Sequence, residues 1–160
     1  MNALPSTLAQ TAPATADDTV IVHKFGGSSV ADAARYRHVA QLLGERDDPV
    51  QVTVVSAMKG VTDALIALAD AAAGNADWPT RHAALHEKHR EAARELLGER
   101  AAPTLTWLDT QFQELSAILG ALALLGPSGE AAKERVHGLG EVWSARLLAD
   151  ALRAAGHDAI

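Results

Sequence analysis

The sequence contains no cysteine. This absence excludes disulfide bonds, zinc sites built on thiolates and thiol nucleophiles at once. A chain that uses no disulfide fits a reducing compartment, so the expected localisation is cytoplasmic. Any chemistry therefore rests on the other side chains and on the backbone.

Positive charge is also scarce. Fourteen Lys and Arg stand against 20 Asp and Glu, which gives a formal net charge of -6. Such a chain repels a polyphosphate backbone, so nucleic acid is not an expected partner.

No stretch reaches the roughly 18 uninterrupted apolar residues of a membrane-spanning helix, and no membrane partner is expected. The opening residues lack the basic segment and apolar core of a signal peptide. We expect residues 1–18 to be a disordered leader and residues 19–160 to be one portion of a domain.

Two β-branched runs, each followed by a helical pattern, organise the first half of the chain. Thr19–Phe25 is predicted to be a strand, and the helix after it has Ser29 as its expected N-cap, with Asp32 in a capping-box arrangement. Val50–Gly60 reads as a strand buried on both faces, again followed by a helix. The βαβα order predicts an α/β fold with a parallel sheet, whose functional groups lie at the carboxyl ends of the strands.

The second half of the chain is predicted to be helical, broken by prolines and glycines. His82, His86 and His89 share one helical face, but the motif is not H-E-x-x-H and the neighbours are charged. We predict a solvated face and no metal site there. The closing residues 156–160 resemble the turn into another strand, so the sequence looks like the N-terminal half of a domain.

The corner between the first strand and helix reads KFGGSSV, from Lys24 to Val30. Glycines at positions 26 and 27 allow positive φ angles and a close approach of the backbone to a ligand. The amides of the first helical turn would point at an anion above the strand end, and Lys24 adds a charge and three donors. The spacing matches neither the P-loop nor the dinucleotide-binding motif. The alternative is a tight turn beside a solvated lysine.

Three segments, in the same order, resemble signatures of the aspartokinases of the amino-acid kinase superfamily. They are KFGGSSV, then VVSAMKGVTDAL from Val54, then GLGEVWSARLLADALRAAGHDA from Gly138. The resemblance implies a three-layer αβα sandwich with a mainly parallel sheet, of which only the N-terminal half with a helix-rich insertion is present. It also implies ATP-dependent phosphorylation of the β-carboxylate of L-aspartate to 4-phospho-L-aspartate with Mg²⁺, the first step of lysine, threonine and methionine biosynthesis.

The resemblance assigns roles residue by residue. Lys24 is implied to be catalytic and to hold the phosphates of ATP together with Gly26, Gly27, Ser28 and Ser29. The chemistry of the reaction agrees with these roles, because a carboxylate that attacks a γ-phosphate brings two anions together. The reaction therefore needs charge neutralisation and alignment more than a strong base.

Three further residues are implied to bind aspartate: Ser56, Thr62 and Glu141, the last through the α-ammonium group. Leu139 and Trp143 depart from the residues that are commoner beside this glutamate in the family. Taken alone, Ser56 simply ends a strand, Thr62 caps a helix and Glu141 is a favourable acid at a helix start.

The second half of the family's catalytic domain has no counterpart in these residues. We therefore expect the 160-residue chain alone to be inactive, and the full-length protein to be a homo-oligomer that acts on aspartate and ATP. The sequence looks more like the bifunctional aspartokinase/homoserine dehydrogenases than the single-function enzymes. Kinases of glutamate, acetylglutamate, carbamate or uridylate, and a non-catalytic α/β module, are the alternatives.

Overall fold

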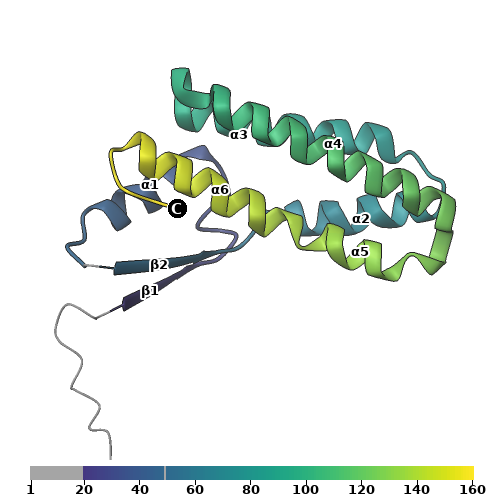
Figure 1. Cartoon of the computed structure of the whole chain (residues 1–160), viewed down its shortest axis with the longest axis horizontal. Coiled ribbons are helices and arrows are strands. Elements are labelled where there is room, and N and C mark those ends of the chain that lie inside the picture. The colour runs from purple at the N-terminus through teal and green to yellow at the C-terminus, as the bar shows by residue number, and fades with distance from the viewer. Residues whose placement is uncertain (1–19, 49) are drawn as a thin grey trace, which may run out of the picture.

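The computed structural model describes residues 20–48 and 50–160 of the chain, so the expected leader, residues 1–18, lies outside the described residues. Two strands and a series of helices follow one another along the chain (Figure 1). The elements are β1 (Val20–Phe25), α1 (Ala33–Gly44), β2 (Val50–Val55), α2 (Val61–Ala73), α3 (Trp78–Leu97), η2 (Gly98–Ala101), α4 (Ala102–Leu125), η3 (Gly126–Ser128), α5 (Glu130–His137) and α6 (Leu139–Ala154).

The two strands form a parallel sheet with α1 as the crossover between them. Their register runs from Val20 opposite Val50 to Phe25 opposite Val55. The carboxyl ends of both strands therefore lie at one edge of the sheet, where the turn into α1 and the loop into α2 begin. The predicted α/β architecture with a parallel sheet is confirmed, and so is the helix-rich segment that follows it.

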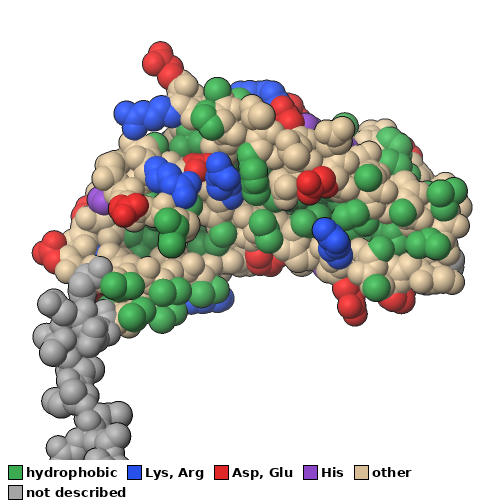
Figure 2. Space-filling model, viewed as in Figure 1, with side chains coloured by type: hydrophobic (Ala, Val, Ile, Leu, Met, Phe, Trp, Pro, Cys, Tyr) green, Lys and Arg blue, Asp and Glu red, His purple; other side chains and the backbone are tan. Residues whose placement is uncertain are grey.

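One face of the sheet is covered and the other is not. In Figure 1 the helices lie above the two strands, and the side chains that alternate toward them are partly buried. Opposite them a row of valines is 45 to 64% exposed, and Figure 2 shows hydrophobic side chains gathered over the strands: Val20, Val22, Val50, Val52 and Val54. The prediction of a second strand buried on both faces is wrong for the described residues, because no element among them covers this face.

Helix α1 begins later than the sequence predicts. Its N-cap is Asp32, whose carboxylate accepts a hydrogen bond of 2.9 Å from the backbone N–H of Arg35. Ser29 is not the cap; its N–H donates to the Gly26 carbonyl at 2.8 Å and closes a turn. The prediction of a Ser29 cap is wrong because Asp32 is an equally good capping residue and lies nearer to the first buried position of the helix.

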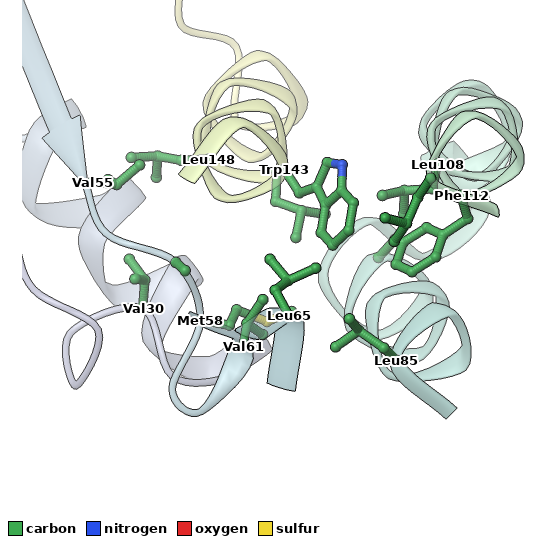
Figure 3. Packing of buried hydrophobic residues seen from close by; sticks show 14 of the residues in the cluster. Val30, Val55, Met58, Val61, Leu65, Leu85, Leu108, Phe112, Trp143 and Leu148 are labelled. Carbon is green, nitrogen blue, oxygen red and sulfur yellow. The ribbon is translucent and has the colours of Figure 1, made fainter. Parts of the chain in front are cut away.

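A hairpin of long helices, α3 and α4, packs beside α2 and α6 to form most of the core (Figure 1). Figure 3 shows Trp143 reaching from α6 toward Leu108 and Phe112 of α4. The ring of Trp143 stacks on Phe112 with 4.4 Å between centroids, and both side chains are fully buried. Helix α6 is thus anchored in the core directly after its first turn.

The three histidines of α3 face α4 and are not a solvated face. His89 is 1% exposed, and its Nδ1–H donates to the Leu85 carbonyl at 2.8 Å. His82 Nε2 hydrogen-bonds to the Phe112 carbonyl and His86 Nε2 to the Asp109 carboxylate, each at 2.8 Å. The prediction was wrong because the charged neighbours occupy the outer face of α3, while the histidines line its contact with α4.

We expect His89 to make folding sensitive to acid. Burial lowers the pKa of His89 from about 6.5 to about 4, although its hydrogen bond to Leu85 opposes that shift. Below pH 6.5 the unfolded chain gains a proton that the folded chain excludes, so stability is complete above this pH and falls until about pH 4. The loss amounts to about 3 kcal/mol.

Urea unfolding between pH 7.5 and 4 measures this loss. In a His89→Leu variant the free energy of unfolding should fall about 3 kcal/mol less over the same range, whereas His38→Gln, on the exposed side of α1, should follow the wild type. Parallel curves for the wild type and His89→Leu would contradict the prediction.

Two classes of feature do not occur in the part of the chain that the structure describes. None of its helices is long and apolar enough to cross a membrane. Within residues 20–48 and 50–160, no group of three or more His, Asp and Glu side chains is arranged to hold a metal ion.

Candidate functional site

The glycines after β1 form a tight turn that packs against the end of β2. Neither Gly26 nor Gly27 has a positive φ angle, so the predicted left-handed conformation is wrong. Glycine is favoured at position 27 for another reason: a Cβ there would lie in tight contact, 3.2 Å from the Ala57 carbonyl oxygen, and 3.7 Å from Ser56 Oγ. This close approach brings the first motif, the phosphate turn (residues 26–29), against the second.

The amides of the phosphate turn do not belong to a helix. Because α1 begins at Ala33, residues 26–29 precede it, and the Asp32 carboxylate already caps its first turn. The first helical turn, expected directly after a cap at Ser29, therefore begins further along the chain than predicted. Any anion bound here meets the turn itself, in the way that successive amides outside helices bind anions.

Lys24 lies beside the phosphate turn. It is the second-last residue of β1, is exposed, and shares the uncovered face of the sheet with Val22. Its Nζ is 3.7 Å from the point where a Cβ on Gly26 would lie. None of the ion pairs formed by the described residues involves Lys24. The ammonium group thus stands over the turn with its charge available to an anion.

Ser56 and Thr62 lie at the two ends of the loop between β2 and α2. The Ser56 N–H donates to the Phe25 carbonyl at 3.0 Å, which continues the parallel ladder one residue beyond β2. Thr62 is the second residue of α2 and does not cap it; Gly60, with φ 77°, holds the N-cap position. Both side chains are partly buried. The reading of Thr62 as a mere helix cap is therefore wrong.

Glu141 is partly buried in the first turn of α6, and the residue before it fixes where that turn lies. A Cβ on Gly140 would lie 2.7 Å from Ala57 Cβ and 3.0 Å from Val61 Cγ1. The backbone of α6 therefore rests directly on the loop that carries Ser56 and Thr62. Three segments that are distant in the sequence meet at one edge of the sheet, while the roles of their residues remain predictions.

Two cavities in the described structure lie elsewhere. One of about 380 Å³ lies between the covered face of the sheet and the C-terminal part of α6, and one of about 460 Å³ lies between α1 and the end of α6. Lys24, Ser56, Thr62 and Glu141 line neither of them. The candidate residues occupy an open edge of the sheet, away from both cavities.

Sequence reasoning missed one residue that supports this edge. Lys88 of α3 donates from its Nζ to the Lys59 carbonyl at 2.8 Å, in the loop between Ser56 and Thr62. The helical hairpin therefore holds the loop from outside. No sequence signal marks Lys88, because it lies among other charged residues 29 positions from its partner.

The profile of the amino acid kinase family matches residues 19–160. The chain belongs to this family. Several similar members of the family are plant proteins. The bifunctional aspartokinase/homoserine dehydrogenase 2 of Arabidopsis thaliana is 37% identical over 137 residues, and the bifunctional enzyme of Daucus carota is 38% identical over 139. These matches cover 84% and 86% of this chain but only 15% of each relative. Aspartokinase 3 of Arabidopsis thaliana is 32% identical over 142 residues, which cover 86% of this chain and 24% of that protein.

Solved structures of family members share the fold. E. coli aspartokinase III in complex with lysine and aspartate superimposes with a TM-score of 0.74 at 23% identity, over 87% of this chain and 30% of that one. The same enzyme in complex with aspartate and ADP gives 0.69 at 25% identity, over 86% and 30%. The predicted amino-acid kinase fold is confirmed, and this chain represents a part of it.

Proposed function

We propose that the protein containing this chain is an aspartokinase, which transfers the γ-phosphoryl group of ATP to the β-carboxylate of L-aspartate. The contacts of Gly27 and Gly140 carry the proposal, because they bring the phosphate turn and the start of α6 onto the same β2–α2 loop. The names of the similar proteins support it. Because the chain spans 15 to 24% of these relatives, the activity is proposed for the whole protein.

Lys24 and the phosphate turn would hold the phosphates of ATP. The reaction brings a carboxylate toward a phosphate, so the protein must align the two groups and neutralise charge. An exposed ammonium group over a turn of glycine and serine residues suits this task. Lys24 does not have to give up an ion pair with another described residue before it meets a phosphate. Gly26, Gly27 and Ser28 would offer backbone amides. The Ser29 amide is donated to the Gly26 carbonyl, so Ser29 would contribute its hydroxyl group, as Ser28 also can.

Ser56, Thr62 and Glu141 would hold aspartate at the same edge. The two hydroxyls can donate to a carboxylate, and the Glu141 carboxylate can accept from the α-ammonium group. An amino acid with two carboxylates and one ammonium group is fixed in one orientation only when both signs of charge are met.

ATP fits these residues better than its metal ion does. The phosphates find Lys24 and the turn, but no carboxylate cluster for Mg²⁺ occurs in the described part of the chain. Magnesium supplies additional neutralisation of phosphate charge when it is bound with ATP. We assign none of these residues to it as a ligand.

Two further expectations remain proposals. A homo-oligomeric full-length protein and a cytoplasmic location both extend what the sequence suggests, whereas the names of the similar plant proteins place those proteins in the chloroplast. A dehydrogenase part, as in the bifunctional relatives, belongs to the same group of proposals.

The decisive test is an acyl-phosphate assay on the natural full-length protein, with hydroxylamine as the trap. We expect trapped product with ATP and aspartate, none with glutamate or acetylglutamate, and none from the 160-residue chain alone. The isolated chain should be inactive because a misplacement of about 1 Å between the reacting groups already costs about a hundredfold in rate. Product with glutamate or acetylglutamate but not aspartate would favour a sibling kinase, and no product at all would favour a non-catalytic module.

A further inference from the structure

A buried pair of hydroxyl groups joins α6 to α1. The Tyr36 hydroxyl and Ser144 Oγ lie 2.7 Å apart, and the two side chains are 0% and 1% exposed. Burial raises the pKa of Tyr36 to about 12, against the opposing effect of its hydrogen bond to Ser144. The phenol therefore stays protonated at physiological pH and keeps a proton for this bond.

The position of this bond connects the two sides of the candidate site. Tyr36 lies in the first turn of α1, the helix that follows the phosphate turn, and Ser144 follows Glu141 by three residues on α6. Residues three apart on a helix share a face, so the rotation of α6 that satisfies Ser144 also sets the direction of Glu141.

The other contacts of the first turns of α6 do not set this rotation as sharply. Gly140 rests on Ala57 and Val61, and Trp143 stacks on Phe112. Both are apolar contacts, which depend on area and tolerate small rotations, whereas a hydrogen bond weakens steeply with angle and distance.

We propose that Tyr36 is a positioning residue for the amino-acid substrate: through its hydrogen bond to Ser144 it holds α6 in the rotation that presents Glu141. This inference rests on the proposed function, and it adds a residue that touches neither substrate. Loss of the bond should weaken capture of aspartate and spare the binding of ATP.

Thr104 offers a matched control on the same helix. Its hydroxyl donates to Asp150 Oδ2 at 2.7 Å, and Thr104 is 2% exposed. This bond also ties α6 to another helix, here α4, but it lies nine residues beyond Glu141. Thr104→Val should lower the melting temperature and leave the KM for aspartate within about twofold of the wild type.

The test measures steady-state kinetics and melting temperature in the full-length protein for Tyr36→Phe, Ser144→Ala, the double variant and Thr104→Val. Each single variant should raise the KM for aspartate about fivefold to tenfold, with kcat and the KM for ATP within about twofold. The double variant leaves no buried hydroxyl unpaired, so its melting temperature should recover toward the wild type. Its KM for aspartate should stay raised.

A KM that returns to the wild-type value together with the melting temperature would overturn the proposal, because the pair would then be merely structural. The same holds if Thr104→Val raises the KM as much as Tyr36→Phe does. If a single variant does not fold, the KM for aspartate and the melting temperature of the double variant are compared directly with those of the wild type. A wild-type protein that phosphorylates another amino acid would refute the proposed function, and the KM for that amino acid would then test the Tyr36–Ser144 bond.

Discussion

Replacing Lys24 by methionine is expected to lower kcat about a hundredfold to a thousandfold, with the KM for aspartate within about twofold of the wild type. Methionine keeps most of the side-chain length and removes the charge that stands over the phosphate turn. That charge should meet the negative charge on the transferring phosphoryl group most strongly in the transition state, so its loss appears in kcat. Steady-state kinetics of the full-length protein measure the effect.

Glu141→Gln provides the contrast within the same site. The ammonium group of aspartate carries the same charge before and during the reaction, so losing its partner should raise the KM about tenfold or more and change kcat less. Lys133→Met removes a lysine that pairs with Asp70 at 3.1 Å near the C-terminal end of α2, and it serves as the charge-matched control for Lys24→Met. An unchanged kcat in Lys24→Met would refute the role of Lys24, and a lowered kcat with unchanged KM in Glu141→Gln would refute that of Glu141.

The second large effect is expected from Gly140→Ala. The added methyl group would lie 2.7 Å from Ala57 Cβ, and that atom is attached directly to the backbone and cannot swing aside. The helix must therefore move away from the β2–α2 loop. We expect the free energy of unfolding to fall by about 1 to 3 kcal/mol, and the KM for aspartate to rise about tenfold because Glu141 moves with the helix.

Gly120→Ala is the matched control for this substitution. Gly120 lies within α4, and a Cβ there would meet no atom within 4 Å. Alanine is the better helix former, so this variant should gain up to about 1 kcal/mol and keep the wild-type KM. Chemical unfolding and the aspartate assay together make the comparison. Equal stability changes in Gly140→Ala and Gly120→Ala would show that the close contact at Gly140 does not constrain α6.

Local patterns predicted the elements of this protein well. The first strand ends at Phe25 as predicted, directly before Gly26. The second is correctly placed but ends at Val55, short of the predicted Gly60, because Ser56 already begins the loop into α2. The family motifs also brought Lys24, Ser56 and Glu141 forward as candidates, and these prove to lie in segments that meet at one edge of the sheet.

What the sequence could not predict depends on contacts between distant segments. His89 looks like part of a charged helix until α4 covers it, and Lys88 looks solvated until the β2–α2 loop meets it. The bond between Tyr36 and Ser144 joins residues 108 positions apart, which no local pattern records. The choice between Ser29 and Asp32 as the cap was wrong for a different reason, since two good capping residues lie within one turn.

The place of α6 in the chain has a consequence for folding during synthesis. Both strands and the α3–α4 hairpin leave the ribosome before α6 does, and 108 positions separate Tyr36 from its partner. Translation at roughly 5 to 20 residues per second makes the nascent chain wait about 5 to 20 s between the two. Through most of that interval the β2–α2 loop lacks the helix that carries Glu141, and in its last part Phe112 lacks Trp143. One late docking event therefore both seals the core and completes the candidate site, so a chain stalled before α6 is left with an open core and without Glu141.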